Sequence, residues 1–351
     1  MTDQRLRNLR ELILAEESMI ITNLTNIRYL CGFTGSNATL VVSHDSAKLC
    51  TDSRYEIQAN QETFGVDIAI DRDTFAFACS SITTDNVAIE AAHLSVAALA
   101  VVKNRATDRV RETTGLVEQL RVVKDETELG YIESACATSM TALKALLPTI
   151  RIGDTERDVA IRLERLLIDS GAEAVAFDSI VAFGSNSAIP HHQPTTRPLA
   201  LTDLVKIDFG ARVSGYHSDC TRTFSMGKPL GWQADIHALA LQAQSTAREH
   251  LRVSVTLGEI DAIARAVVAE GGHGSAFTHG LGHGVGLAIH EEPFFKPGSA
   301  DRIHNNTVIT VEPGIYLAGQ GGVRIEDTVV VTEHGYRNLT QFDYELLDLT
   351  T

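Results

Sequence analysis

Two pairs of carboxylates stand inside apolar, strand-like runs of this sequence, and they constrain its fold more than any other feature. Asp208 interrupts LVKIDFG, and Asp219 follows eleven residues later in GYHSDCTRTF. A charge in such a run is costly unless it is paired or bound to a metal ion. If the two runs form a hairpin that turns near Val213 and Ser214, the aspartates face each other, because opposed residues on one face of a hairpin lie close together.

A second pair of carboxylates repeats this pattern. TVITVEPGIY places Glu312 in a strand that ends at Pro313, and GGVRIEDTVVV places Glu326 in another strand. Their midpoint is Gly319, inside the turn-like LAGQGG, so these two residues are also symmetric across a hairpin. One such carboxylate is usually solvated or paired with a neighbour such as Arg324. Two mirrored pairs instead favour a metal site, because a bridging cation turns repulsion into attraction.

The composition of this site narrows the choice of metal. Four carboxylates favour hard or borderline cations such as Mn²⁺, Co²⁺ or Zn²⁺, and so many negative charges suit two ions better than one. A histidine would complete an oxygen-rich ligand set. The stretch HGLGHGVGLAIHEEP supplies the candidates His279, His283 and His290.

The overall charge argues against large anionic partners. The chain has 351 residues, with 30 Lys and Arg against 45 Asp and Glu, a formal charge of −15. It has no spare positive charge to neutralise nucleic-acid phosphates or an anionic membrane. No apolar run approaches the length needed to span a bilayer. The five cysteines are odd in number and form no CxxC pair, which indicates free thiols in a reducing compartment, and we expect a cytoplasmic protein.

A change in the pattern of helix-like and strand-like runs near residue 122 predicts two domains. Residues 1–122 alternate short strand-like runs such as ATLVVS and NVAIE with helix-like runs such as TFAFACSSI, which predicts an α/β layer domain. Residues 123–351 begin with long helical patterns and continue with β-rich stretches and glycine turns. This second part predicts an α+β domain whose helices cover one face of a curved antiparallel sheet.

Capping signals locate the helices of the second domain. Asp125 is a plausible N-cap with Glu128 at the third helical position, and the pattern ends at Pro148. In GDTERDVAIRLERLLIDSG, either Asp154 or Thr155 caps the next helix. Two further helices are predicted over residues 232–251 and 257–270.

Several motifs, in order and at matching spacing, resemble one known family. IDFGARVSGYHSDCTRTF, HGLGHGVGLAIHEEP, TVEPGIY and GGVRIEDT, with IPHH upstream, resemble the pita-bread metallopeptidases of family M24, in particular their Xaa-Pro branch, prolidase and aminopeptidase P. GFTGSNA and TDSRY resemble the creatinase-type N-terminal domain of the same enzymes. The resemblance implies a creatinase-like domain over residues 1–122 and a pita-bread catalytic domain over residues 123–351.

The resemblance also implies a role for individual residues. Two divalent metal ions are held by five ligands, which are Asp208, Asp219, His283, Glu312 and Glu326. His191 in IPHH and His290 correspond to substrate histidines. Arg324 corresponds to a substrate-site arginine that orders the metal-ligand network, with a structural salt bridge as an equal alternative. Glu312 also moves the proton of the attacking water to the leaving nitrogen. The roles of His192 and His279 stay open.

The implied activity is hydrolysis of the bond before proline in short peptides with a free N-terminus, by a homodimer. The resemblance favours an Xaa-Pro dipeptidase, with an Xaa-Pro aminopeptidase acting on longer peptides as the alternative. Creatinase-like enzymes and non-enzymatic scaffolds of this fold lack the metal ligands, and methionine aminopeptidases usually lack such an N-terminal domain. The group that would bind the substrate carboxylate is not identifiable, although Arg28 and Arg54 are candidates.

Overall fold

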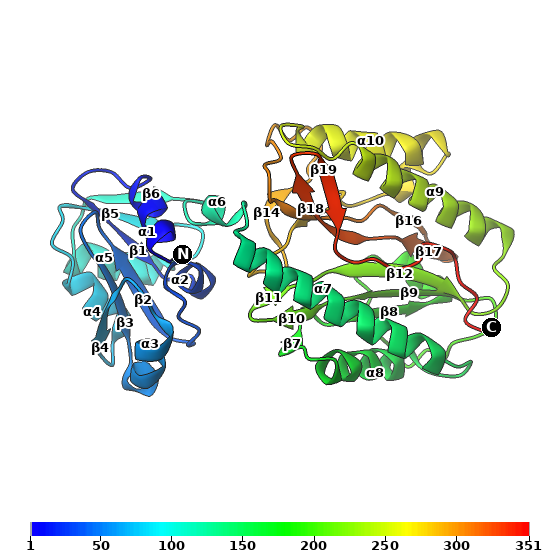
Figure 1. Ribbon diagram of the computed structural model, residues 1–351, viewed down its shortest axis with the longest axis horizontal. Helices are drawn as coiled ribbons and strands as arrows, with labels where there is room; N and C mark the ends of the chain where they lie inside the picture. The colour runs from blue at the N-terminus through cyan, green and yellow to red at the C-terminus, as the bar shows by residue number, and fades with distance from the viewer. Residues whose placement is uncertain (1, 351) are drawn as a thin grey trace. The chain divides into compact units, whose positions relative to one another are not determined.

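The computed structural model describes residues 2–350, and the chain folds into two compact units. The first unit is Met1–Arg121 and the second is Val122–Thr351. Figure 1 shows the order of helices and strands along each unit. The expected combination of an α/β unit followed by an α+β unit is confirmed.

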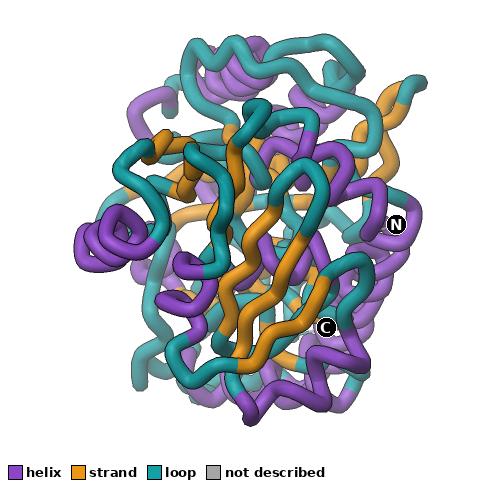
Figure 2. Tube along the Cα trace, turned by 90° about the vertical axis from the view of Figure 1, so that its left-hand side faces the viewer, coloured by secondary structure: helices purple, strands orange, loops and turns teal. Residues whose placement is uncertain are grey.

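The first unit is built on a six-stranded mixed sheet in the order β4-β3-β2-β1-β5-β6. Its strands run side by side in Figure 2, with helices at the flanks. The elements are α1 Thr2–Arg10, β1 Glu17–Ile21, α2 Leu24–Cys31, β2 Ala38–Val42, β3 Ala47–Thr51, η1 Ser53–Tyr55, α3 Glu56–Glu62, β4 Asp67–Ile70, α4 Thr74–Ser80, β5 Asn86–Glu90, α5 Val96–Arg105, β6 Val110–Thr113 and α6 Glu118–Arg121.

The predicted strand-like runs ATLVVS and NVAIE are present as β2 and β5, and β6 is a strand that no apolar run indicated. β6 carries charged residues in VRET and is only partly buried, because it forms the edge of the sheet, so it lacks the apolar signal of a central strand. One core cluster of this unit consists of β-branched and small side chains from the sheet and from α4 and α5.

Four long helices frame the second unit, and the first two start at the predicted caps. They are α7 Glu126–Leu146, α8 Glu156–Asp169, α9 Gly231–Glu249 and α10 Leu257–Glu270. Asp125 and Glu128 form a capping box at α7. Thr155, rather than Asp154, is the N-cap of α8. Each of these boxes satisfies backbone N–H groups that a helix start leaves unpaired.

The strands of this unit form four antiparallel sheets instead of one continuous curved sheet. The sheet orders are β11-β10-β7, β12-β9-β8, β14-β13-β15-β18-β19 and β16-β17. The strands and short helices are η2 Leu147–Thr149, β7 Ala174–Val175, β8 Ile180–Phe183, η3 Gly184–Ala188, β9 Leu204–Phe209, β10 Ala211–Val213, β11 Tyr216–His217, β12 Cys220–Ser225, η4 Gly274–Ala276, β13 His283–Gly284, β14 Glu291–Phe294, β15 Val308–Val311, β16 Gly314–Leu317, β17 Gly321–Arg324, β18 Asp327–Thr332 and β19 Gly335–Asn338.

Two separate cores show that the unit has two halves. Helices α7 and α8 bury apolar side chains against β8, β9 and β12, whereas α9 and α10 bury theirs against β15 to β18. Figure 1 shows one helix pair on either side of the strands. Each half contains one of the two hairpins that carry the carboxylate pairs.

The first of these hairpins differs from its predicted register by two residues. Asp208 pairs with Thr221, not with Asp219. The turn consists of Ser214 and Gly215, one residue later than predicted, and both have positive φ, as a two-residue turn of the primed type requires. Asp219 therefore lies just before β12, at the interruption between the β10–β11 and β9–β12 ladders.

The second hairpin has the predicted register around Gly319. β16 and β17 pair in this register, and the same register continues beyond them, pairing Val311 with Asp327 in β15 and β18. Glu312 and Glu326 occupy the interruption between these two ladders, so the prediction that they lie within strands is wrong by one residue. In both hairpins a carboxylate thus lies where the chain passes from one sheet to the next. An interruption of the ladder at such a position changes the direction in which side chains point.

The part of the chain that the structure describes has neither a helix suited to crossing a membrane nor a disulfide. Among residues 2–350 no helix is long and apolar enough to cross a membrane. All five cysteines are free and buried.

Candidate active site

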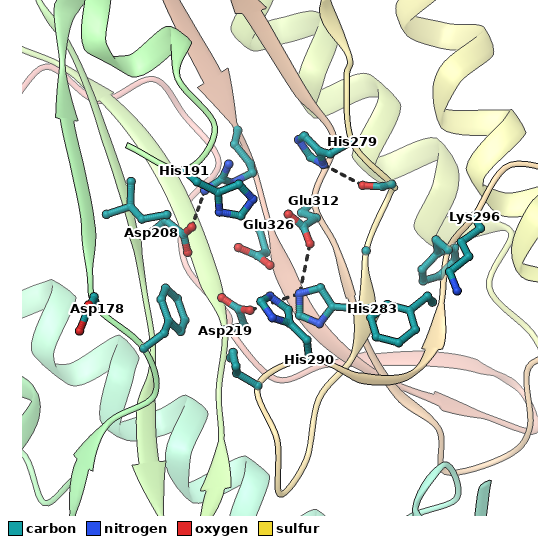
Figure 3. A pocket seen from close by; sticks show the side chains of 18 of the residues that line it. Asp178, His191, Asp208, Asp219, His279, His283, His290, Lys296, Glu312 and Glu326 are labelled. Atoms are coloured by element: carbon teal, nitrogen blue, oxygen red, sulfur yellow. Dashed lines mark hydrogen bonds and ion pairs between the residues drawn. The ribbon is translucent and has the colours of Figure 1, made fainter. Parts of the chain in front are cut away.

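A cavity of about 490 Å³ in the second unit gathers the residues that the sequence singled out. Figure 3 shows the carboxylates pointing into one common space, with histidines around it. The residues singled out in the sequence that line the cavity are His191, Asp208, Asp219, His279, His283, His290, Glu312, Arg324 and Glu326.

His283 lies beside two of the carboxylates. Its Nε2 atom is 3.5 Å from Asp219 Oδ2 and 3.4 Å from Glu312 Oε1. Ligand atoms of Asp219, His283 and Glu326 all lie within 4.8 Å of one another, and all three residues are buried. Asp208 lies across the cavity, paired with Arg324, and its Oδ1 atom is buried without a hydrogen-bond partner. An unpaired buried carboxylate oxygen facing three other carboxylates fits a cation at this position.

The carboxylates of this cluster repel one another. Burial raises the pKa of Asp219 and of Glu326 well above their usual values, and repulsion between the carboxylates raises them further. Burial also raises the pKa of Glu312 to about 7. Like charges at such distances cannot all ionise without a counter-charge. A divalent cation supplies that counter-charge, so the donor set fits a metal of the oxygen-preferring or borderline kind.

His283 is held in the form that binds metals. Burial lowers its pKa to about 3, so the imidazole is neutral at physiological pH, as a metal ligand must be. The adjacent glycines bring its strand close to its neighbours. A Cβ on Gly282 would lie 2.2 Å from the Thr310 carbonyl oxygen, and one on Gly284 would lie 2.4 Å from the Glu292 carbonyl oxygen. These glycines therefore serve close packing of the backbone beside the site.

The other histidines differ in their surroundings. The His290 ring meets the His283 ring edge to face, with centroids 4.4 Å apart, and His191 lies exposed on the cavity wall. His279 Nε2 lies 2.9 Å from Tyr316 Oη. His192 does not line the cavity, and its Nε2 atom lies 2.8 Å from Glu156 Oε2.

Arg324 is buried, and its guanidinium connects several parts of the site. It donates hydrogen bonds to the carboxylate of Asp208, to Thr221 Oγ1 at 3.0 Å, to Tyr316 Oη at 2.9 Å and to the Pro190 carbonyl oxygen at 3.2 Å. These bonds tie one proposed metal ligand to the chain segment that carries His191.

Sequence reasoning missed two threonines that bond directly to the carboxylates. Thr221 Oγ1 donates to Glu326 Oε2 at 2.7 Å, and Thr310 Oγ1 donates to Glu312 Oε1 at 3.1 Å. Thr310 stands two residues before Glu312, and this spacing was the only local signal. Thr221 could not be found, because its partner is distant in sequence.

Lys296 also lines the cavity, at the opposite end from Asp178 in Figure 3. No motif in the sequence indicated Lys296.

Comparison with family models divides the chain in the same way. Residues 130–333 match the model of metallopeptidase family M24. Residues 5–123 match the Creatinase/Prolidase N-terminal domain.

Individual relatives match nearly the whole chain. The Xaa-Pro dipeptidase of Pyrococcus horikoshii is 35% identical over 94% of this chain and 94% of its own length. A solved Xaa-Pro dipeptidase from Bacillus anthracis superposes with a TM-score of 0.96 at 32% identity, covering 99% of this chain and 100% of the other. An X-Pro aminopeptidase from Thermotoga maritima superposes with a TM-score of 0.89 at 35% identity, covering 97% and 99%.

Proposed function

Because the chain belongs to metallopeptidase family M24, we propose that it hydrolyses the peptide bond before proline in short peptides with a free N-terminus, with Xaa-Pro dipeptides as favoured substrates. The observation that carries this proposal is the convergence of four carboxylates and His283 on one cavity. The proline preference is supported by the names of the relatives, which include both Xaa-Pro dipeptidases and an X-Pro aminopeptidase.

We propose two divalent metal ions, Mn²⁺, Co²⁺ or Zn²⁺, as the cofactor. Five residues would hold them, namely Asp208, Asp219, His283, Glu312 and Glu326. The raised pKa values of the carboxylates, the neutral His283 and the unpaired Asp208 oxygen support this ligand set. Such ions, when bound, supply Lewis acidity toward the peptide carbonyl and lower the pKa of water.

The side chains of the cavity would supply the remaining steps. Glu312 would accept the proton of the attacking water and pass it to the proline nitrogen as the C–N bond breaks, since its carboxylate lines the cavity beside the other proposed ligands. His290 and His191 would each donate an imidazole N–H to the substrate, where a hydrogen bond to the developing oxyanion lowers the barrier. Burial lowers the pKa of His290, which favours a neutral imidazole that still has one N–H. Arg324 would keep Asp208 and the Pro190 backbone aligned with the substrate.

The size of the cavity favours a small substrate. A volume of about 490 Å³ is within the range of small-molecule sites and accommodates a dipeptide or tripeptide rather than a folded chain.

Arg54, a candidate for binding the substrate carboxylate, already donates two hydrogen bonds of 2.8 Å to the Asp52 carboxylate. We also propose a cytoplasmic homodimer, an expectation that rests on the family resemblance and on the five free cysteines. Sedimentation would measure the oligomeric state.

A cleavage panel tests this function. Ala-Pro, Ala-Pro-Ala, Ala-Ala and N-acetyl-Ala-Pro are incubated with the protein loaded with Mn²⁺, Co²⁺ or Zn²⁺. We expect Ala-Pro to be cleaved fastest, and Ala-Ala and the acetylated peptide to resist. Comparable cleavage of Ala-Ala would refute the proline preference. Cleavage of the tripeptide without the dipeptide would instead identify an aminopeptidase.

A further inference from the structure

The position of His191 is set by its neighbours in the chain. Its imidazole forms no hydrogen bond with any of the residues 2–350, although it lies on the wall of the cavity (Figure 3). It stands in the segment 189–192, which follows η3 and belongs to no helix or strand. A side chain without bonds of its own can hold a reactive position only if its backbone is held.

Lys206 holds this backbone through its amine. Its side chain is 0% exposed, in the middle of β9. Its Nζ atom donates a hydrogen bond to the Ile189 carbonyl oxygen at 2.7 Å, and the Pro190 carbonyl oxygen lies 3.5 Å away. The same Nζ lies 5.1 Å from the centre of the Tyr316 ring. Lys206 does not line the cavity, so it acts on the substrate only through other residues.

Two other groups hold the same segment from different directions. Arg324 Nη1 donates to the Pro190 carbonyl oxygen at 3.2 Å. On the far side of His191, the imidazole of His192 bonds to Glu156, a buried carboxylate at the start of α8 that also accepts the backbone N–H of Thr195 at 2.9 Å. The carbonyls before His191 and the side chain after it are thus held, which leaves only the His191 imidazole directed at the cavity.

A buried lysine is costly, and this cost indicates that Lys206 has a role. Burial lowers its pKa well below the usual value, and the nearby charge of Arg324 lowers it further. An apolar residue in the middle of such a strand would avoid this penalty. The amine donates N–H bonds whether or not it is charged, so its grip on the Ile189 carbonyl does not depend on its protonation state.

We propose that Lys206 is a positioning residue for His191, which acts by holding the carbonyls of Ile189 and Pro190. The inference rests on the proposed function, in which His191 donates a hydrogen bond to the substrate. Strand β9 would then contribute two residues to the site, the proposed metal ligand Asp208 and the positioning residue Lys206. A misplacement of about 1 Å in a group that contacts the reacting atoms costs on the order of 100-fold in rate.

A double-mutant cycle tests this inference. Lys206→Met is made in the wild type, in His191→Ala and in His290→Ala, and the metal content, kcat and KM for Ala-Pro are measured. In the wild type we expect kcat to fall by at least about 10-fold, with metal content unchanged and KM changed less than about 2-fold. In His191→Ala the same substitution changes kcat by less than about 2-fold, because the residue that Lys206 positions is gone. In His290→Ala we expect Lys206→Met to lower kcat as much as it does in the wild type, because His191 is still present. This background is therefore the matched control. Equal losses in both backgrounds, or an unchanged kcat in the wild type, overturn the proposal.

Hydrogen exchange gives a second readout that needs no activity. We expect the amides of residues 184–195 to exchange faster in Lys206→Met than in the wild type, and to be unchanged in His290→Ala. If the wild type cleaves no Xaa-Pro peptide, the proposed function fails, and unchanged exchange would separately refute the restraint by Lys206. If Lys206→Met does not fold, Lys206→Gln replaces it. Gln keeps an N–H donor on a shorter side chain, and we expect a smaller loss of kcat with the same dependence on His191.

Discussion

The hydroxyl of Thr310 connects Glu312 to His283. It donates to Glu312 Oε1 at 3.1 Å and accepts the backbone N–H of His283 at 3.1 Å. One side chain thus fixes both a carboxylate and the strand that carries the histidine. The orientation of metal ligands depends on such neighbouring bonds, and their loss commonly costs roughly 10- to 100-fold in activity or metal affinity.

Replacing Thr310 therefore tests how the ligands are oriented. We expect Thr310→Val to lower kcat/KM by about 10-fold or more, because Glu312 loses a donor and the His283 N–H loses its acceptor. The unpaired N–H also costs about 1–3 kcal/mol of folding free energy. The measurements are steady-state kinetics and thermal unfolding. Thr141→Val, on the exposed face of α7, is the control and should change neither. Equal kinetics for both variants would remove Thr310 from the site.

Removal of a proposed metal ligand should cost metal and activity together. We expect Asp208→Asn to weaken metal binding by more than about 100-fold, because it removes one negative charge from a site built on charge balance. Metal content after desalting, measured by mass spectrometry, checks this. Asp169→Asn, an exposed residue at the end of α8, should retain the wild-type content. Chelation should likewise abolish hydrolysis, and full activity in a metal-free preparation would contradict the metal site.

The histidines should separate into two groups. We expect His283→Ala to lose metal, since its Nε2 lies between two carboxylates. His191→Ala and His290→Ala should keep metal but lose about 10²- to 10⁴-fold in kcat, the usual contribution of a hydrogen-bonding or proton-transferring side chain. Metal content and kcat are measured on the same samples. If His290→Ala released metal as readily as His283→Ala, this division of roles would be wrong.

The metal-free protein should lose stability as pH rises. The folded-state pKa of Glu312 is raised to about 7, above the ordinary value of 4.5. Its protonated form therefore favours folding below pH 4.5, and this contribution is lost as pH rises through about 7, with a slope of at most about 1.4 kcal/mol per pH unit. Asp219 and Glu326 have raised pKa values and act in the same direction.

Thermal unfolding of chelated protein between about pH 5 and pH 8.5 measures this effect. We expect the midpoint to fall with pH in the wild type and to fall less steeply in Glu312→Gln, which cannot ionise at that position. Added Mn²⁺ should flatten the wild-type curve, because the cation offsets the carboxylate charges. A wild-type slope that matches that of Glu312→Gln would show that Glu312 does not titrate in this range.

Local patterns predicted those parts of the fold that depend on nearby residues. The caps predicted at Asp125 and at Asp154 or Thr155 mark helix starts correctly, because a cap bonds to backbone groups within three residues. The turn around Gly319 is also correct, since a hairpin register follows from its turn. The edge strand β6 was missed, because an exposed edge needs no apolar pattern.

The first hairpin shows where local reasoning ends. Asp208 and Asp219 share a hairpin, but the turn at Ser214 and Gly215 shifts the register by two residues and pairs Asp208 with Thr221. A change of one residue in the position of the turn moves every pairing by two. The sequence therefore indicated that the carboxylates meet, but it did not determine how they meet.

The sequence by itself determined that carboxylates and a histidine gather at one site, because charged groups within or next to apolar strands need a counter-charge. Only the tertiary structure decided which groups hold them in place. Thr221 bonds to Glu326 across 105 positions of the chain, and Arg324 to Asp208 across 116. Lys206 lies in β9, and its amine bonds to the Ile189 carbonyl oxygen, 17 positions away in the chain. Such partners are set by the packing of separate hairpins and loops against one another, and no local pattern in the chain encodes that packing.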